Sequence, residues 1–156
     1  MTTLAERAGL FLAQPRVAVA GVSRMRQDAA NLIYRRLKAR GYQVYPVNPN
    51  ASTVEGDSCY PALAAIPGGV TAVVIVTRPS VTEEIVRQCP DAGVTHVWMH
   101  RSLAHGDSVS ADAVAFCEAR GINVIPGGCP LMFGQTSDFG HRCMRWVMRI
   151  SGRLAA

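Results

Sequence analysis

The sequence predicts an α/β protein in which one doubly wound parallel sheet of about five strands carries helices on both faces. Short, nearly continuous apolar segments alternate with segments whose apolar residues recur at helical spacing. Such uniformly apolar segments are typical of strands that are buried on both faces. No internal repeat, low-complexity tract or linker interrupts the chain, so residues 1–156 are expected to form a single domain.

The strands are expected where the chain is apolar without interruption. Arg16 to Gly21 reads RVAVAG and ends in a glycine, which permits a sharp turn after a buried strand. Four later segments are also expected to be strands: Gln43 to Val47, Ala72 to Val76, Thr95 to Met99, and Ile122 to Ile125. Because strands alternate with helices, they should run parallel through right-handed crossovers.

Helices are expected between and outside these strands. Asp28 is a residue type that caps helices, and a stripe of apolar residues follows it until Gly41 ends the pattern. A second helical face runs from Val81 to Cys89, and a third runs from Ser110 to Arg120. The ends of the chain add two more amphipathic segments: Leu4 to Leu12 and Phe139 to Leu154.

The charge of the chain narrows the classes of ligand. It has 16 basic and 11 acidic residues, for a net charge of +5, and every basic residue except Lys38 is an arginine. Guanidinium groups stay charged and match phosphate oxygens in bidentate geometry, so an anionic partner is expected. Charge alone leaves nucleic acid, acidic lipid and a phosphorylated small molecule open.

Cysteine and hydropathy patterns favour a cytoplasmic protein. The five cysteines are odd in number, widely spaced and without a CxxC pair, which argues against a disulfide framework or a zinc ribbon. The N-terminal segment lacks the apolar core and the cleavage site of a signal peptide. The longest uncharged stretch, Ser58 to Thr77, is interrupted by prolines and glycines, so no membrane span is expected.

The candidate site lies in the segments that follow the strands, because ligands of open parallel sheets bind beyond the carboxyl ends of the strands. The first such segment, Gly21 to Asp28, reads GVSRMRQD. Its amides, the Ser23 hydroxyl, Arg24 and Arg26 favour a phosphate cradle at a helix N-terminus. A solvent-exposed turn is an equal alternative, and a capping Asp28 would compete with an anion for the same amides.

The second strand ends in YPVNPN, Tyr45 to Asn50, where two prolines restrict the backbone and withhold amide protons. This segment is expected to be a stiff wall for a flat ring, or simply a rigid turn. An NAD(P) site is the alternative, but its G-x-G-x-x-G motif would require glycines where the chain has Ser23 and Arg26. It would also require an acid at the end of the second strand, where the sequence has none.

The third and fourth strands are followed by Thr77-Arg78-Pro79-Ser80 and by His100-Arg101-Ser102. His100 is a candidate for hydrogen bonding or proton transfer, although a single histidine at a strand end is more often structural or solvated. Arg78 and Arg101 would join the two arginines of the first loop in a ring at one edge of the sheet. Such a ring favours a polyanion.

Several longer motifs resemble a known family. The chain carries, in succession, VAVAGVS, a helix ending in ARGYQVYPVNPN, EGDSCYPALAAIP, VTAVVIVTRPS and VTHVWMH. These motifs are similar to those of the small stand-alone coenzyme A-binding domain family, which resembles the N-terminal domain of the succinyl-CoA synthetase alpha subunit. The resemblance runs from about Arg16 to Gly127.

The resemblance implies a Rossmann-like core over residues 16–127 that binds coenzyme A (CoA) or an acyl-CoA. The loop from Gly21 to Gln27 would wrap the phosphates, and the segments Pro46 to Asn50 and Thr77 to Pro79 would border the adenosine and the pantetheine, with Met99 and His100 nearby. The implied site residues are Gly21, Val22, Ser23, Arg24, Met25, Arg26, Val47, Asn48, Pro49, Thr77, Arg78, Pro79 and His100. Met25 and Arg26 make the first loop bulkier than the glycine-rich loop of the synthetase, and His100 replaces what is often a glutamine.

No catalytic role is expected for the chain itself. The phosphorylated histidine of the synthetase lies in a second domain, for which a chain of this length has no room, and the sequence lacks a nucleophile elbow. Cys129, His141 and Cys143 have a spacing that a soft metal accepts, but on a helix the last two point in different directions. Cys129 follows the last strand, and one hypothesis is that its thiol exchanges with the CoA thiol.

The C-terminal helix is expected to carry a basic stripe: Arg142, Arg145, Arg149 and Arg153. A solvated helix face is the simplest interpretation, and contact with acidic lipid is an alternative. Nucleic acid is not expected, because no aromatic residues or reader motif accompany the arginines. The same helix is the candidate surface for a homo-oligomer, or for an interaction subunit that keeps the fold but has lost its ligand.

Overall fold

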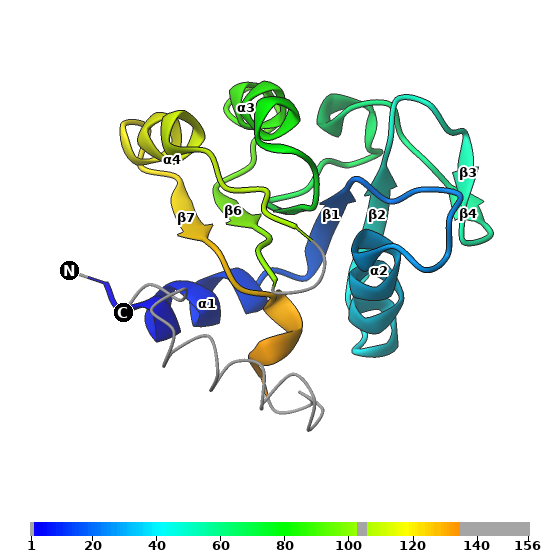
Figure 1. Cartoon of the computed structure of the whole chain (residues 1–156), viewed down its shortest axis with the longest axis horizontal. Helices are drawn as coiled ribbons and strands as arrows, with labels where there is room; N and C mark the ends of the chain where they lie inside the picture. Colours follow the sequence, from blue (N-terminus) through cyan, green and yellow to red (C-terminus); the bar gives the residue numbers. More distant parts are fainter. Residues whose placement is uncertain (1, 103–105, 135–156) are drawn as a thin grey trace.

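A computed structural model of the chain describes residues 2–102 and 106–134. Its centre is a parallel five-stranded sheet with the order β2-β1-β5-β6-β7 (Figure 1). The strands are β1 (Arg16–Ala20), β2 (Gln43–Val47), β5 (Ala72–Ile75), β6 (His96–Met99) and β7 (Asn123–Pro126). The predicted α/β class and the five parallel strands are confirmed, and the strand bounds differ from the predicted ones by one residue at most at each end.

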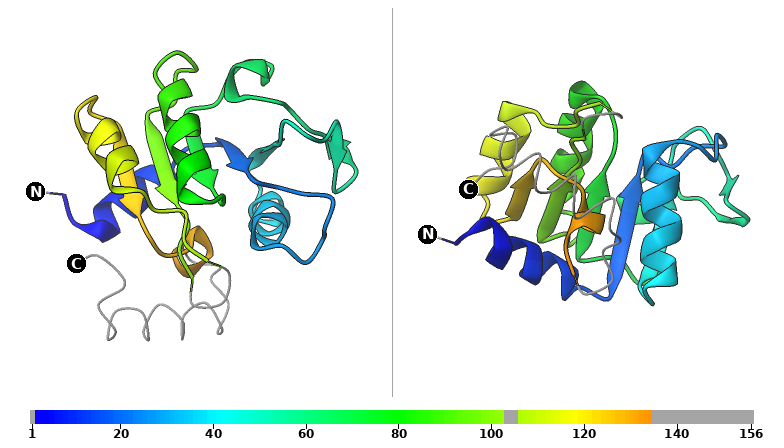
Figure 2. Two further views of the ribbon diagram at one scale, coloured as in Figure 1. Left: turned by 45° about the horizontal axis from the view of Figure 1, so that its top comes forward. Right: turned by 60° about the horizontal axis from the view of Figure 1, so that its bottom comes forward.

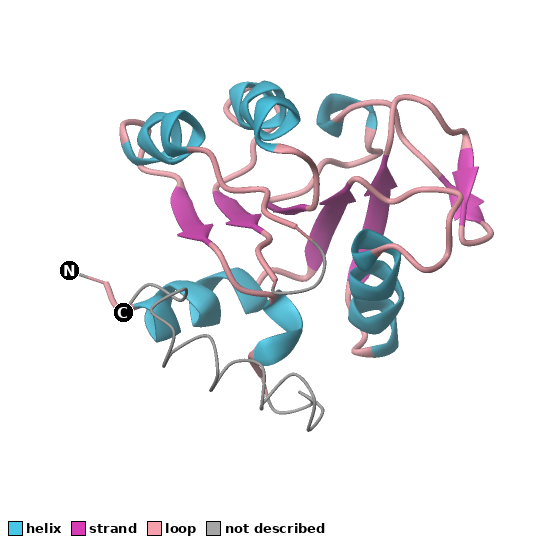
Figure 3. Ribbon diagram, in the orientation of Figure 1, coloured by secondary structure: helices cyan, strands magenta, loops and turns pink. Residues whose placement is uncertain are grey.

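Helices cover both faces of the sheet, as Figure 3 shows. One face packs against α1 (Leu4–Leu12) and α2 (Ala29–Ala39), and the other packs against α3 (Pro79–Gln88) and α4 (Ala111–Glu118). The alternating residues of β1 show the two-sided burial, because Val17 and Val19 join the first core while Ala18 and Ala20 join the second. Burial on both faces explains why the strands are apolar without alternation.

The aromatic residues of the core lie on the face that α1 and α2 cover. Trp98 of β6 is completely buried, and its ring meets Phe11 of α1 edge-on with 5.3 Å between the centroids. The indole nitrogen donates a hydrogen bond of 3.0 Å to the carbonyl of Gly127, so its polar atom is satisfied within the core. The N-terminal helix therefore belongs to the core of the fold.

The strand order places a topological switch point between β1 and β5. β1 leads into α2 on one face, whereas β5 leads into α3 on the other, so the two connections leave the carboxyl edge in opposite directions. Ligands of open α/β sheets bind in the crevice that such a reversal opens. The order 2-1-3-4-5 along the parallel strands, with helices on both faces, confirms the Rossmann-like, doubly wound arrangement that the sequence motifs imply.

Gly21 closes the floor of this crevice and has two reasons to be glycine. Its φ of +102° lies in a region that side chains disfavour. A Cβ atom at this position would also lie 2.1 Å from the carbonyl oxygen of Val76, so the chain can pass the end of β5 only without a side chain. The glycine is required by the packing of β1 against β5, whatever ligand is present.

A small antiparallel hairpin stands beside α2, beyond the edge strand β2, and the sequence did not indicate it (Figure 2). It consists of β3 (Thr53–Val54) and β4 (Asp57–Ser58), which are joined by Glu55 and Gly56. Two short 3-10 turns, Leu63–Ala65 and Pro130–Met132, were also not predicted. The predicted C-terminal helix lies outside the described residues, and within the described part of the chain no helix is long and apolar enough to cross a membrane.

Candidate functional site

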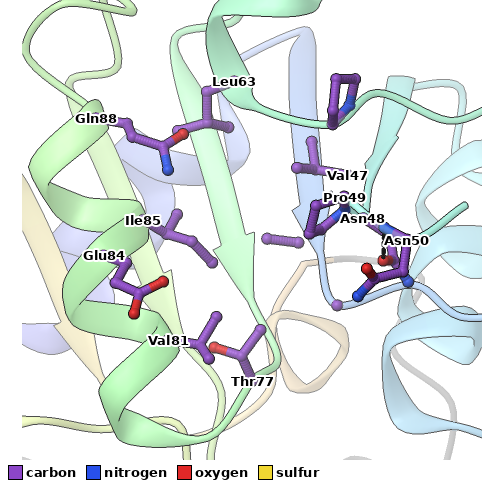
Figure 4. Close-up of a pocket in the computed structure, with 13 residues that line it drawn as sticks. Val47, Asn48, Pro49, Asn50, Leu63, Thr77, Val81, Glu84, Ile85 and Gln88 are labelled. Atoms are coloured by element: carbon purple, nitrogen blue, oxygen red, sulfur yellow. Dashed lines mark hydrogen bonds between the residues drawn. The ribbon is translucent and has the colours of Figure 1, made fainter.

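A cavity of about 310 Å³ opens at the switch point (Figure 4). One wall is the segment that follows β2, the opposite wall is one face of α3, and the ends of β1 and β5 form the floor. The lining residues are Ala20, Gly21, Val47, Asn48, Pro49, Asn50, Pro61, Leu63, Thr77, Val81, Glu84, Ile85 and Gln88. The cavity therefore lies where the strand order predicts a ligand site.

The chemistry of the lining is mostly apolar, with polar groups at a few positions. Branched aliphatic side chains and two prolines make the walls, and Asn48, Asn50, Thr77 and Gln88 add neutral hydrogen-bonding groups. Glu84 is the one charged residue among the lining residues, and it is exposed at the rim. A cavity with this lining suits an uncharged, partly apolar group better than a phosphate, because the only fixed charge is negative.

Five of the thirteen expected site residues line this cavity: Gly21, Val47, Asn48, Pro49 and Thr77. The polar side chains among them, those of Asn48 and Thr77, are held by hydrogen bonds within the protein. The side-chain nitrogen of Asn48 donates to the carbonyl of Val22 at 2.9 Å, and its side-chain oxygen accepts from the backbone N–H of Asn50 at 2.8 Å. The hydroxyl groups of Thr77 and Thr82 share a hydrogen bond of 3.0 Å. The polar side chains after β2 and β5 are therefore held in place before any ligand arrives.

The wall formed by α3 was missed as part of a site. Val81, Glu84, Ile85 and Gln88 stand at positions i, i+3, i+4 and i+7 and face the segment 47–50 across the cavity (Figure 4). From the sequence alone, the segment from Val81 to Cys89 is expected as a helical face, with no role in a site. Ile85 has both roles, because it lines the cavity and also belongs to the core between the sheet and the helices α3 and α4.

The first loop, residues 21–28, lies on the side of the cavity that leads to α2, and its own hydrogen bonds shape it. Asp28 occupies the N-cap position of α2, but its side chain makes no capping bond. Its carboxylate instead accepts a hydrogen bond of 2.5 Å from the Ser23 hydroxyl, which itself accepts from the Met25 amide at 2.9 Å. The expectation that Asp28 caps the helix by its side chain is wrong, because Ser23 is the nearer donor.

A buried polar network behind this loop was not predicted. Asn31 of α2 is completely buried, and it accepts from the Ser23 amide at 3.0 Å and donates to the Ser23 carbonyl at 2.8 Å. The same amide nitrogen donates to the Glu55 carboxylate at 2.7 Å. The hydrogen bond from Asn31, and then the charges of Arg35 and Arg26, lower the pKa of Glu55 below its usual value against the effect of burial.

The predicted ring of four arginines is divided in the structure. Arg101 pairs with Asp107 at 2.9 Å, and the guanidinium of Arg26 lies 3.6 Å from the Glu55 carboxylate. Arg24 and Arg78 are exposed, and neither forms an ion pair with any residue that the structure describes. Arg101 thus has its own carboxylate partner, Arg26 shares Glu55 with Arg35, and Arg24 and Arg78 are available to an external anion.

Three expected participants lie away from the cavity. Val22 is fully buried in the core, and His100 is 2% exposed, with its backbone bonded to Ile75 and Ser108. Cys129 is 4% exposed and packs in the core that α1 and α2 cover. The hypothesis of thiol exchange at Cys129 is therefore not supported by its position. Ser23, Arg24, Met25, Arg26, Arg78 and Pro79 flank the cavity in sequence but do not line it.

No group of three or more potential metal ligands occurs among residues 2–102 and 106–134. Four cysteines lie in this part of the chain, and all four are free thiols in buried positions. Burial raises the pKa of Cys89 to about 12 and that of Cys117 to about 11, which disfavours the reactive thiolate. His141 and Cys143, which completed the candidate metal series with Cys129, lie outside the described residues.

The fold and the cavity together define an α/β domain with a cavity at the switch point of a parallel sheet, where ligands of such sheets bind. Comparison with known families makes this class specific: the CoA binding domain family matches residues 15–135. The chain belongs to this family. Membership of the family supports coenzyme A as the ligand of this chain. The resemblance that the sequence motifs indicated is confirmed.

Individual relatives are longer enzymes and small proteins. Two ADP-forming acetate–CoA ligases of Archaeoglobus fulgidus are similar to the chain, with 33% identity over 81 residues for ligase II and 26% identity over 118 residues for ligase I. These matches cover 50% and 72% of the chain, but only 12% and 17% of the two ligases. The chain therefore corresponds to a small part of these enzymes.

Solved structures give the same picture of the fold. A hypothetical protein from Pyrococcus horikoshii OT3 superposes with a TM-score of 0.75 and 26% identity, covering 83% of this chain and 87% of that one. A dinucleotide-forming acetyl-coenzyme A synthetase from Ca. Korarchaeum cryptofilum, solved with phosphate and ADP, superposes with a TM-score of 0.62 and 25% identity. That match covers 76% of this chain and 26% of the synthetase.

Proposed function

We propose that the protein binds CoA or an acyl-CoA across the carboxyl edge of its sheet, with the phosphates on the first loop and an uncharged part of the ligand in the cavity. One observation carries this proposal. The cavity holds a single charged residue, the acid Glu84, whereas Arg24 and Arg78, which form no ion pair with any residue in the described part of the chain, follow the two strands that form its floor. Charge thus separates two binding regions that CoA, with its separate charged and uncharged parts, can occupy together.

The cavity side of the proposal rests on desolvation and charge. A phosphate placed there would exchange its hydration for apolar walls and would face the Glu84 carboxylate, which is unfavourable on both counts. A flat or extended neutral group would instead lie against Pro49, Leu63 and Ile85. The amides of Asn50 and Gln88 supply donors and acceptors for its polar atoms.

The loop side of the proposal rests on the N-terminus of α2. Because Asp28 makes no side-chain cap, its carboxylate does not occupy the amides of the first turn of α2 and leaves them to an anion, although its negative charge stays at the same helix end. The exposed Arg24 lies in the same loop, and Arg78 is the N-cap residue of α3 across the switch point. Both guanidinium groups suit phosphate oxygens.

CoA is favoured over NAD(P) by the residues at the end of β2 as well as by the family. An adenosine ribose in a dinucleotide site would be held there by a carboxylate, and the chain has Asn48, whose amide is already bonded to Val22 and Asn50. The first loop has no second glycine to let a diphosphate approach closely. An NAD(P) module remains the alternative that the titration below distinguishes.

The role proposed is binding, such as carrying or sensing CoA or an acyl-CoA in the cytoplasm. The acetate–CoA ligase relatives use the matching region as a small part of a much longer chain. Our proposal therefore includes no ligase reaction, and it makes this region the CoA-binding part only. A partner contact or homo-oligomer through the C-terminal segment stays a prediction from the sequence, since that segment lies outside the described residues.

Isothermal titration calorimetry tests the proposal with CoA, acetyl-CoA, NAD and ATP as ligands of the full chain. We expect saturable binding of CoA or acetyl-CoA and much weaker binding of NAD and ATP. Absence of CoA binding at millimolar concentration would contradict the proposal, and tight NAD binding in its place would assign the protein to the dinucleotide-binding class.

A further inference from the structure

We propose that Glu55, at the tip of the β3–β4 hairpin, is a positioning residue that holds the first loop, residues 21–28, in the conformation that receives the ligand. The inference rests on the proposed function, in which this loop carries the phosphates. Glu55 acts through two residues of α2, Asn31 and Arg35, which reach the loop directly. No local pattern in the sequence indicates this role, because the hairpin itself is not predicted.

The backbone of Glu55 is unusual for its residue type. Glu55 has a φ of +53° and Gly56 a φ of +83°, so both central residues of the two-residue hairpin turn are left-handed. Turns of this kind prefer Asn-Gly, because asparagine tolerates the left-handed region and glutamate does not. A strained non-glycine residue that persists in such a turn indicates that its side chain has a purpose.

That side chain is buried in a network that ends at the loop. The Glu55 side chain is 5% exposed, and one of its oxygens accepts from the Asn31 amide nitrogen at 2.7 Å. The same nitrogen donates to the Ser23 carbonyl, while the Asn31 oxygen accepts from the Ser23 amide. An ionised carboxylate can only accept, so Glu55 determines which end of the Asn31 amide faces it and therefore how Ser23 is held.

A second route from Glu55 holds the other part of the loop. Arg35 stands one helical turn after Asn31, and its terminal nitrogen donates both to Glu55 at 2.7 Å and to the Arg26 carbonyl at 3.0 Å. The Arg26 side chain, which is 77% exposed, is the more distant partner of the same carboxylate. Two residues on one face of α2 thus hydrogen-bond the loop backbone, at Ser23 and at Arg26. Glu55 accepts from both of these helix residues and so connects the two contacts.

The hairpin has a separate anchor that serves as a matched control. Asp57, two residues further on, accepts from the Tyr34 hydroxyl and from the Lys38 ammonium group, both at 2.5 Å. These contacts also fasten the hairpin to α2, but none of the hydrogen bonds or ion pairs of Asp57 involves residues 21–28. A change at Asp57 therefore alters the contact between the hairpin and α2 but removes no hydrogen bond of Glu55 or of the loop.

Three single variants of the full chain separate positioning from hairpin stability: Glu55→Asn, Glu55→Gln and Asp57→Asn. Asparagine suits the left-handed turn better than glutamate but is too short to keep the bridge, so a purely structural role predicts unchanged or improved behaviour. We expect Glu55→Asn to weaken CoA binding about tenfold, the size expected for losing a hydrogen bond to a charged group. Glu55→Gln keeps an acceptor for Asn31 and Arg35, and we expect it to stay within about threefold of the wild type.

Hydrogen exchange of the ligand-free proteins gives a readout that does not depend on CoA. We expect Glu55→Asn to speed amide exchange at residues 23–26, and Asp57→Asn to leave both that exchange and CoA affinity near the wild-type values. The proposal is overturned if Glu55→Asn leaves the loop exchange and the affinity unchanged, or if Asp57→Asn reduces affinity as much. A wild type that does not bind CoA would refute the proposed function alone, and the exchange data would still decide the role of Glu55.

Discussion

The two sides of the candidate site are built in opposite ways. The wall on α3 is formed by side chains that project from a regular helix, and its single charged group, Glu84, is exposed at the rim. The first loop, residues 21–28, is irregular backbone, and buried polar residues behind it, Asn31 and Glu55, determine its shape. A helix face presents a ready apolar surface, whereas a loop needs partners to hold its amides in one arrangement.

This contrast explains how a small domain can bind a ligand with very different ends. An apolar wall gains free energy by removing neutral surface from water, and it needs few oriented groups. A phosphate-binding loop needs amides and guanidinium groups aimed at one place, which requires that they be ordered before the ligand arrives. The two regions meet at the switch point, where Gly21 and Thr77 line the floor of the cavity.

Filling the cavity is expected to have the largest effect. Val81 is half-buried on α3 and lines the cavity, so the indole ring of Val81→Trp would occupy the space proposed for the ligand. We expect CoA affinity to fall by roughly a hundredfold or more in calorimetric titration, because the clash removes the neutral contacts altogether. Val114→Trp, at a half-buried valine of α4 outside the cavity, is the matched control, and an equal loss there would show that the effect is not local.

Removing the unpaired arginines is expected to have the next largest effect. Arg24→Gln and Arg78→Gln should each weaken CoA binding about tenfold and make it less sensitive to salt, because each removes a guanidinium available to phosphate. Arg101→Gln removes a guanidinium that Asp107 already neutralises, so it should change the affinity less. Equal effects of the three variants would contradict the division of the arginines into paired and unpaired groups.

Acid should weaken the attachment of the β3–β4 hairpin to α2, which both Glu55 and Asp57 make. The pKa values of Glu55 and Asp57 are lowered in the folded state, the first chiefly by Asn31 and the second chiefly by Lys38. A carboxyl group whose pKa is lowered by folding stabilises the folded state fully when the pH is above its unfolded pKa, 4.5 for Glu55 and 3.8 for Asp57. This stabilisation is lost as the pH falls through the pKa of the folded state. Urea unfolding between pH 7 and pH 3 should therefore show a decline that is smaller in a Glu55→Gln, Asp57→Asn double variant, and an identical decline would contradict this origin.

Neutralising the cavity acid is expected to have the smallest effect. Glu84 is exposed and repels the phosphates of a bound CoA only weakly, so Glu84→Gln should tighten CoA binding by no more than about threefold. Titration at low and at high salt should show the difference shrink as screening increases. A large loss of affinity would instead mean that the carboxylate bonds directly to the ligand.

Much of the fold could be predicted from the sequence because burial on both faces leaves a strong signal. β1 and β5 contain the continuous apolar segments VAVA and AVVI, and the structure has both strands within one residue of the predicted bounds. The hairpin gave no such signal, since β3 and β4 have two residues each and its Glu-Gly turn is not a preferred hairpin pair. Elements this short are determined by tertiary contacts such as the one between Asp57 and Lys38.

The candidate site was predictable in part for a related reason. The segments after β1, β2 and β5 could be found from the sheet rule alone, and they supply the floor and one wall of the cavity. The role of α3 could not be separated from core packing, because Ile85 serves both. The pairing of Arg26 with Glu55 depends on a contact between distant parts of the chain, which no local pattern reveals.

A crystal structure of the protein with bound CoA tests the central claim most directly. The account predicts an uncharged part of CoA, adenine or pantetheine, between Pro49 and Ile85, with phosphate oxygens beside the first loop, residues 21–28, and near the guanidinium groups of Arg24 or Arg78. Phosphates inside the cavity beside Glu84, or CoA bound away from the switch point, would contradict it.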